Sequence, residues 1–112
     1  MINNWIQHTF HDVATVAANG AALDVDGFKT LTVEVYGTST SRNINFLGKG
    51  PSGATRSLPG CKMSGDTNFT MATSTTSTGE IWQFDITGLE YVLMDLTAVA
   101  GGNVSIKGRV LL

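Results

Sequence analysis

Charged residues are scarce in this sequence. The 112 residues include seven Lys and Arg and nine Asp and Glu, so that only 14% are charged, well below the roughly 25% of a typical globular protein. Thr, Ser, Gly and Asn make up much of the polar content instead. A net charge of -2 leaves no basic surplus for binding phosphates. We therefore expect neither nucleic acid nor an anionic membrane among the partners of this protein.

Cysteine and long apolar runs are also in short supply. The single Cys61 cannot form an intrachain disulfide, and no histidine or second cysteine lies near it in sequence, so we interpret it as an unreactive thiol. No stretch approaches about 18 consecutive apolar residues, and the first residues lack the basic start and apolar middle of a signal peptide. We expect a chain that is made and folded in a cytoplasm and that forms a single domain.

Helical periodicity is missing as well, and the apolar residues recur with a period of two. In the C-terminal third this alternation predicts three half-buried strands, over Trp82–Ile86, Val92–Leu96 and Val104–Val110. Turn residues separate them, at Thr87-Gly88 and at Gly101-Gly102-Asn103. We interpret these strands as an antiparallel meander that forms much of one sheet, with Trp82 in the core.

The N-terminal half supplies the strands that would cover this sheet. Thr30–Tyr36 alternates clearly and is the natural partner of the C-terminal sheet, and Asn43–Leu47 is a shorter strand. Asn19-Gly20 is a strong hairpin signal, which predicts that Val13–Ala17 pairs with Ala21–Val25. The pattern indicates an all-β fold, an antiparallel β-sandwich with jelly-roll or Greek-key connections.

Two polar stretches lack periodicity. Gly48–Gly60 holds both prolines, and Thr73–Thr78 is rich in hydroxyls, so we predict that together they form the mobile, partner-facing end of the sandwich. Lys49 and Arg56 make this end a candidate electrostatic contact. Between the two stretches, Cys61–Met63 and Asn68–Ala72 are predicted as short strands around a Ser64-Gly65-Asp66 turn.

Catalytic and metal-binding patterns are missing too. The acids Asp85, Glu90 and Asp95 occupy outward positions of the predicted C-terminal strands rather than a pocket. Asp24 and Asp26 resemble the start of a calcium loop, but apolar residues follow where oxygen ligands are needed. His8 and His11, three residues apart, have no further ligands nearby and are interpreted as surface or interface histidines. We expect a protein that is not an enzyme and binds no metal or cofactor.

The N-terminal segment carries exposed aromatic candidates. Residues 1–11 are expected to form an arm or an edge strand outside a single sandwich domain of residues 12–112, and Trp5, Ile6 and Phe10 are its candidate partner-binding residues. An arm with exposed aromatics usually docks on another subunit, which predicts a homo-oligomer. Trp5 is also the tryptophan that remains available as a platform for a sugar ring.

Three segments carry a resemblance to a known group of proteins. Asp26–Val35 with Gly37-Thr38, then Trp82–Leu89, then Ala98–Lys107 resemble the strand and turn motifs of small β-sandwich virion structural proteins of tailed bacteriophages, of the head decoration or tail accessory type. The likeness spans about residues 20–111. One departure lies at Phe46–Gly53, which keeps the frame of a family segment but lacks its acid and its tryptophan.

The resemblance implies a non-enzymatic virion structural protein. The first role that the resemblance implies is that of a capsid decoration or cementing protein, which is made in the host cytoplasm and located in the virion. The alternative is a carbohydrate-binding, host-adhesion module associated with the tail tip or baseplate. Expected partners are further copies of the chain and other virion proteins, either the major capsid protein or tail proteins.

Overall fold

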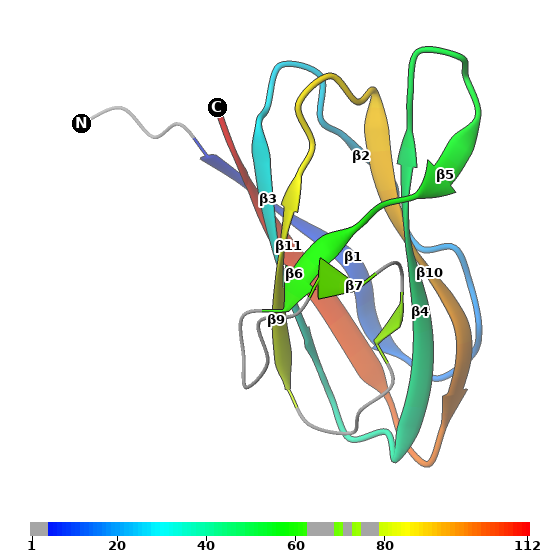
Figure 1. Ribbon diagram of the computed structural model, residues 1–112. Coiled ribbons are helices and arrows are strands. Elements are labelled where there is room, and N and C mark those ends of the chain that lie inside the picture. Colours follow the sequence, from blue (N-terminus) through cyan, green and yellow to red (C-terminus); the bar gives the residue numbers. More distant parts are fainter. Residues whose placement is uncertain (1–4, 63–68, 71–72, 75–78) are drawn as a thin grey trace.

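The computed structural model describes residues 5–62, 69–70, 73–74 and 79–112. In this part of the chain all regular structure is β-strand, arranged as two antiparallel sheets that pack face to face (Figure 1). The predicted all-β antiparallel sandwich is therefore confirmed. Among the described residues there is no helix long and apolar enough to cross a membrane.

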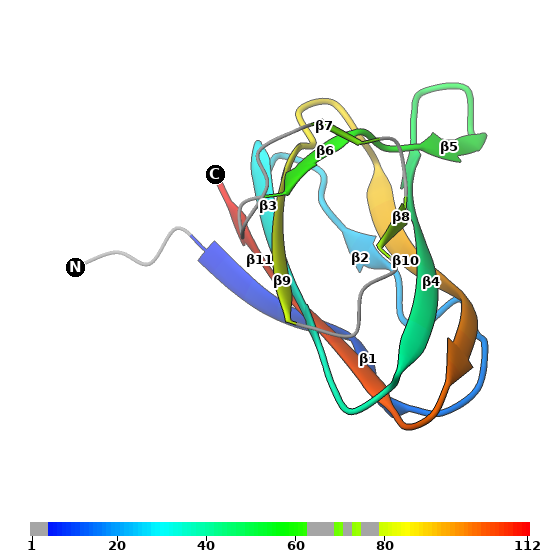
Figure 2. The same cartoon turned by 60° about the horizontal axis from the view of Figure 1, so that its bottom comes forward.

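Both sheets join strands that are far apart in sequence. Sheet A has the order β1 (Trp5–Ala14), β11 (Val104–Leu111), β3 (Thr30–Tyr36), β9 (Glu80–Asp85), β6 (Gly60–Lys62), β7 (Phe69–Thr70). Sheet B has the order β2 (Leu23–Asp24), β10 (Tyr91–Ala100), β4 (Ser41–Lys49), β5 (Thr55–Ser57), and β8 (Thr73–Ser74) also pairs with β4. Figure 2, viewed from below, separates the two layers.

Apolar side chains from the inner faces of the two sheets fill the space between them. The inward residues predicted for the strand at Thr30–Tyr36 and for the three C-terminal strands are all buried. Phe46 of sheet B lies 4.9 Å, between ring centroids, from both Trp82 and Phe84 of sheet A. This aromatic cluster joins the layers, because tilted and edge-on rings interlock across the interface. Trp82 is a core residue, as predicted.

The predicted C-terminal meander is wrong in its connections. β9, β10 and β11 are strands with the predicted inward faces, but β10 belongs to sheet B while β9 and β11 belong to sheet A. The turn after β9 carries the chain from sheet A to sheet B. At the sheet B end of this turn, the carbonyl of Glu90 accepts the amide of Val25, the residue after β2, at 3.0 Å. A two-residue period identifies the buried face of a strand but not the sheet to which it belongs. The expectation that Thr30–Tyr36 pairs with these strands is confirmed on both sides, by β11 and β9.

The hairpin predicted at Asn19-Gly20 is also wrong. Gly20 has the positive φ of a turn, +73°, but the chain passes from sheet A to sheet B before it, between β1 and Ala18. β1 pairs with β11 in sheet A, whereas Ala18 bridges to Leu96 and β2 pairs with β10, both in sheet B. Gly20 permits a close approach to β1 instead, since a Cβ at this position would lie 2.5 Å from both the His11 Nε2 and the Phe10 carbonyl oxygen.

The glycine- and proline-rich stretch is more ordered than its composition predicts. Thr55–Ser57 pairs with Leu47–Lys49, so most of Gly48–Gly60 belongs to a β4–β5 hairpin closed by a turn at residues 50–54. Leu58 is buried, and its amide bonds to the Phe46 carbonyl at 2.8 Å. The stretch is paired although its sequence lacks periodicity, because backbone pairing and one buried leucine outweigh local composition.

The segment between β5 and β9 is described only in part. β6 begins at Gly60 and overlaps the predicted strand Cys61–Met63, β7 lies within the predicted strand Asn68–Ala72, and β8 lies within the polar stretch Thr73–Thr78. Met63, the turn at Ser64-Gly65-Asp66, and residues 68, 71–72 and 75–78 lie outside the described residues.

Candidate functional site

The candidate functional surface is the outer face of sheet A, the side turned away from sheet B. The strand registers align its side chains in rows that run across the sheet. One row, called here the glutamine row, consists of Gln7, Arg109, Thr32, Gln83 and Cys61. The next, called here the lysine row, consists of Thr9, Lys107, Glu34 and Ile81. Residues drawn from five strands thus meet on one polar surface.

Trp5 borders the glutamine row. Its indole is 39% exposed, and the Arg109 guanidinium lies over the ring at 4.4 Å from the centroid. The Nε of Arg109 also donates to the Gln7 side-chain oxygen at 3.2 Å. The cation–π contact and the hydrogen bond together hold Trp5, Gln7 and Arg109 in one arrangement.

The three N-terminal candidates do not share a surface. Ile6 is exposed, but it alternates with Trp5 along β1 and therefore points to the opposite side of the strand. Phe10 is only 2% exposed and lies in the core, in edge-on contact with His8 at 4.6 Å. The interpretation of Phe10 as a partner-binding residue is therefore corrected: β1 is an integral strand of sheet A, and its alternation buries this ring.

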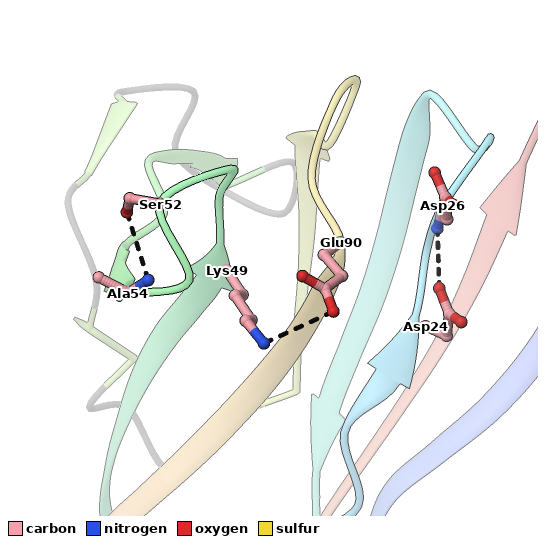
Figure 3. A network of polar contacts seen from close by, with 6 residues as sticks. All are labelled: Asp24, Asp26, Lys49, Ser52, Ala54 and Glu90. Carbon is pink, nitrogen blue, oxygen red and sulfur yellow. Dashed lines mark hydrogen bonds and ion pairs between the residues drawn. The ribbon is translucent and has the colours of Figure 1, made fainter.

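Lys49 and Arg56 lie on sheet B, away from Trp5. The Lys49 ammonium is 3.5 Å from the Glu90 carboxylate and 5.1 Å from the centre of the Tyr91 ring. Figure 3 shows Lys49 reaching from β4 toward Glu90, with the hairpin turn at Ser52 and Ala54 beside it. Arg56 is exposed on β5. The structure thus separates the two groups of predicted site residues onto different layers.

The two histidines and the two N-terminal acids have structural roles. His11 is buried, and its Nε2 is 2.7 Å from the Met94 carbonyl, which joins β1 to β10. The interpretation of His11 as a surface or interface histidine is wrong, whereas His8 is half-buried with its Nε2 2.9 Å from the Ala21 carbonyl. The Asp24 carboxylate accepts the Asp26 amide at 3.0 Å in an exposed turn (Figure 3). Among the described residues no group of three or more His, Cys, Asp or Glu is placed to hold a metal ion.

Two of the acids considered for catalysis lie on opposite sides of the molecule. Asp85 lies on the outer side of sheet A and Asp95 on that of sheet B, so the whole core separates them. The Thr87 amide donates to the Asp85 carboxylate at 3.0 Å, and this bond lowers the pKa of Asp85 below its usual value. A carboxyl group held ionised in this way is poorly suited to act as a general acid.

Sequence reasoning missed a buried charged cluster between the sheets. Glu80 of β9 is 2% exposed; it accepts the Trp82 indole N–H at 3.2 Å and lies 3.5 Å from the Lys62 ammonium. Arg42 of β4 is equally buried and donates to the Ser39 hydroxyl at 3.1 Å. Burial lowers the pKa of Arg42, and the Glu80 carboxylate partly opposes that shift. The sequence does contain a signal for this cluster. Arg42 lies two residues before Ile44 and Glu80 two residues before Trp82, so each continues the series of inward positions on its strand.

Comparison with known sequences identifies relatives, two of which are described as phage-like or prophage-derived. The sequence profile of the XepA family matches residues 4–110. In Bacillus subtilis (strain 168), the phage-like element PBSX protein XepA is 41% identical over 99 residues, which cover 88% of this chain and 34% of XepA. The uncharacterized protein YqxG is 42% identical over 99 residues, covering 88% and 32%. The chain therefore spans about a third of the length of these two relatives. The SPbeta prophage-derived uncharacterized protein YomS of the same organism is 39% identical over 102 residues, covering 91% of this chain and 83% of YomS.

Two solved structures share the fold. The crystal structure of the SPBc2 prophage-derived protein YomS superposes with a TM-score of 0.88 at 34% identity, over 100% of this chain and 96% of that one. The crystal structure of XepA, described as a PBSX exported protein, superposes with a TM-score of 0.90 at 35% identity, over 96% of this chain and 38% of that one. Sequence and structure agree over nearly the whole chain, and this protein belongs to the XepA family of phage-element proteins.

Proposed function

We propose that this chain is a non-enzymatic structural protein of a phage or prophage, and that it decorates a capsid by docking on other virion proteins as a homo-oligomer. The observation that carries the proposal is strand β1, an edge strand of sheet A whose pairing within the described residues is to β11 alone. An edge strand offers unpaired amides and carbonyls to another chain. The phage and prophage relatives support this assignment, and the weakly charged, polar sequence suits repeated contacts on a crowded particle.

Self-association through β1 is tested by a charge on the edge. We expect the wild type to sediment as an oligomer and Ile6→Lys to shift it toward monomer, because an inward-pointing charge on an edge strand opposes pairing with another chain. Val16→Lys is the matched control, since Val16 is also exposed but lies beyond the end of β1. A monomeric wild type, or equal masses for the two variants, would contradict the proposed oligomer.

Docking on the particle is tested with shells that lack the protein, mixed at low and high salt and imaged. We expect the wild type to occupy the shells and the double variant Lys49→Ala/Arg56→Ala to lose occupancy, most clearly at low salt where ionic contacts are strongest. Each exposed ion pair contributes only about 0.2–1 kcal/mol, so the affinity must come from many copies on a repeated lattice.

The control for this experiment is Lys107→Ala/Arg109→Ala, which removes the same charge from sheet A. Retained occupancy for that control and loss for the first variant would place the contact on the β4–β5 hairpin. Full occupancy of the Lys49→Ala/Arg56→Ala variant rules out the hairpin as an electrostatic contact. Failure of the wild type to bind any shell would contradict capsid decoration itself.

A second candidate function is host adhesion through carbohydrate binding. Trp5 favours it, because the ring is exposed beside polar side chains on the outer face of sheet A. The description of the XepA relative as exported also supports a role that reaches the cell surface.

A further inference from the structure

We propose that the outer face of sheet A binds an uncharged segment of a bacterial cell-surface glycan, in a hollow between the glutamine and lysine rows. This inference rests on the second candidate function, host adhesion, and is independent of capsid decoration. It goes beyond a single tryptophan platform, because it assigns the recognition to side chains from four strands.

The site is a shallow hollow of about 270 Å³ across β1, β11, β3 and β9. Its lining consists of Gln7, Thr32, Glu34, Ile81, Lys107, Gly108 and Arg109. A second hollow, of about 320 Å³, shares Thr32 and extends the surface to Gln83 and Asp85. The depression arises at Thr32 because this short side chain lies between the longer Arg109 and Gln83 in the glutamine row. The two adjoining hollows suit an extended ligand better than a compact one.

The contacts available in the hollow match a chain of hydroxyl groups. Gln7 and Gln83 present amides, Glu34 presents acceptors, and Lys107 and Arg109 present donors. Arg109 is held in place by Trp5 and Gln7, and Gln83 donates weakly to the Thr32 hydroxyl at 3.5 Å. Ile81 adds an exposed apolar surface, against which the C–H face of a sugar ring can pack. Few, fixed polar groups beside apolar and aromatic surface are the usual composition of such sites.

The charges on this surface balance. The charged residues that line the two hollows are Lys107, Arg109, Glu34 and Asp85, so the formal charges of the lining cancel. The pKa of Lys107 is raised, chiefly by its hydrogen bond with the Tyr36 side chain, and that of Asp85 is lowered, so both groups remain charged near neutral pH. A surface of zero net charge favours neither a polyanion nor a polycation. An uncharged glycan segment satisfies the polar groups without leaving a charge unbalanced.

The test is an array that carries neutral oligosaccharides from bacterial cell-surface glycans and anionic teichoic acid, probed with the full chain. We expect binding to the neutral oligosaccharides, with backbone amide shifts in NMR spectra at Thr32, Gln83 and Lys107 when the bound sugar is titrated. Arg109→Ala should weaken binding by about tenfold or more, because it releases Trp5 and Gln7 together. The matched control Arg56→Ala removes an exposed arginine from sheet B and should bind as the wild type does.

Three outcomes would overturn the inference: no uncharged glycan bound at millimolar concentration, binding to teichoic acid alone, or shifts that map to sheet B. Thermal unfolding of both variants, each changed at an exposed arginine, confirms that a loss of binding is not a loss of fold. The shell experiment depends on Arg56 and tolerates loss of Arg109, so a failure here and a failure of capsid decoration give different patterns.

Discussion

Replacing Glu80 with alanine is expected to lower the free energy of unfolding by about 3–5 kcal/mol, because it removes one partner from a buried group of charges. The Glu80 carboxylate accepts the Trp82 indole N–H and lies 3.5 Å from the Lys62 ammonium. It also offsets part of the desolvation of the buried Arg42 guanidinium. The variant keeps two cations and an indole N–H in or near the core while deleting the anion that they share.

Glu90→Ala is the matched control, because Glu90 also lies 3.5 Å from a lysine ammonium but its side chain is 59% exposed, against 2% for Glu80. Water screens the exposed pair, so its loss should cost no more than about 1 kcal/mol. Urea unfolding of both variants measures the difference. An equal loss of unfolding free energy in the two variants would show that burial does not increase the contribution of Glu80 to stability. A third variant, Glu80→Gln, would separate the effect of the lost charge from that of the lost hydrogen bond.

Gly20→Ala is expected to destabilise the protein by about 2–4 kcal/mol, the sum of backbone strain and steric overlap. The φ of Gly20 is +73°, and an added Cβ would lie 2.5 Å from both the His11 Nε2 and the Phe10 carbonyl oxygen. The displaced imidazole is the one whose Nε2 contacts the Met94 carbonyl at 2.7 Å. The substitution therefore disturbs a contact that holds the edge strand β1 against sheet B.

Gly53→Ala provides the control for the strain alone. Gly53 has a comparable φ of +86°, but nothing lies within 4 Å of an added Cβ, so the expected cost is about 1 kcal/mol. Thermal or urea unfolding of the two variants compares them directly. A Gly20→Ala variant no less stable than Gly53→Ala would show that the crossing at residues 15–22 is not closely packed.

The candidate site was only partly predictable from the sequence. Trp5 and Ile6 are exposed as expected, because they lie near the end of an edge strand. The alternation along β1 places Phe10 on the opposite face from Trp5, where it is buried in the core. Lys49 was identified as a cation, yet its position beside Glu90 and Tyr91 depends on the pairing of β4 with β10. Nothing in the sequence places Gln7, Thr32 and Gln83 in one row, since they belong to strands that are distant in the chain.

By itself the sequence determined the fold class and the buried face of each main strand. Leu31, Ile44, Trp82, Met94 and Ile106 are all in the core, as their two-residue period predicts, because a side chain on a pleated strand must point to one side or the other. This information is local, and each strand carries it independently of its neighbours.

Only the tertiary structure decided which strands are neighbours. β9, β10 and β11 have the same alternation and equivalent turn residues, yet β10 lies in the opposite layer from the other two. The choice depends on pairing energies and on packing between sheets summed over the whole chain. The buried Glu80 cluster and the rows on the outer face of sheet A follow from that choice, because each consists of residues that are close only after the two sheets have formed.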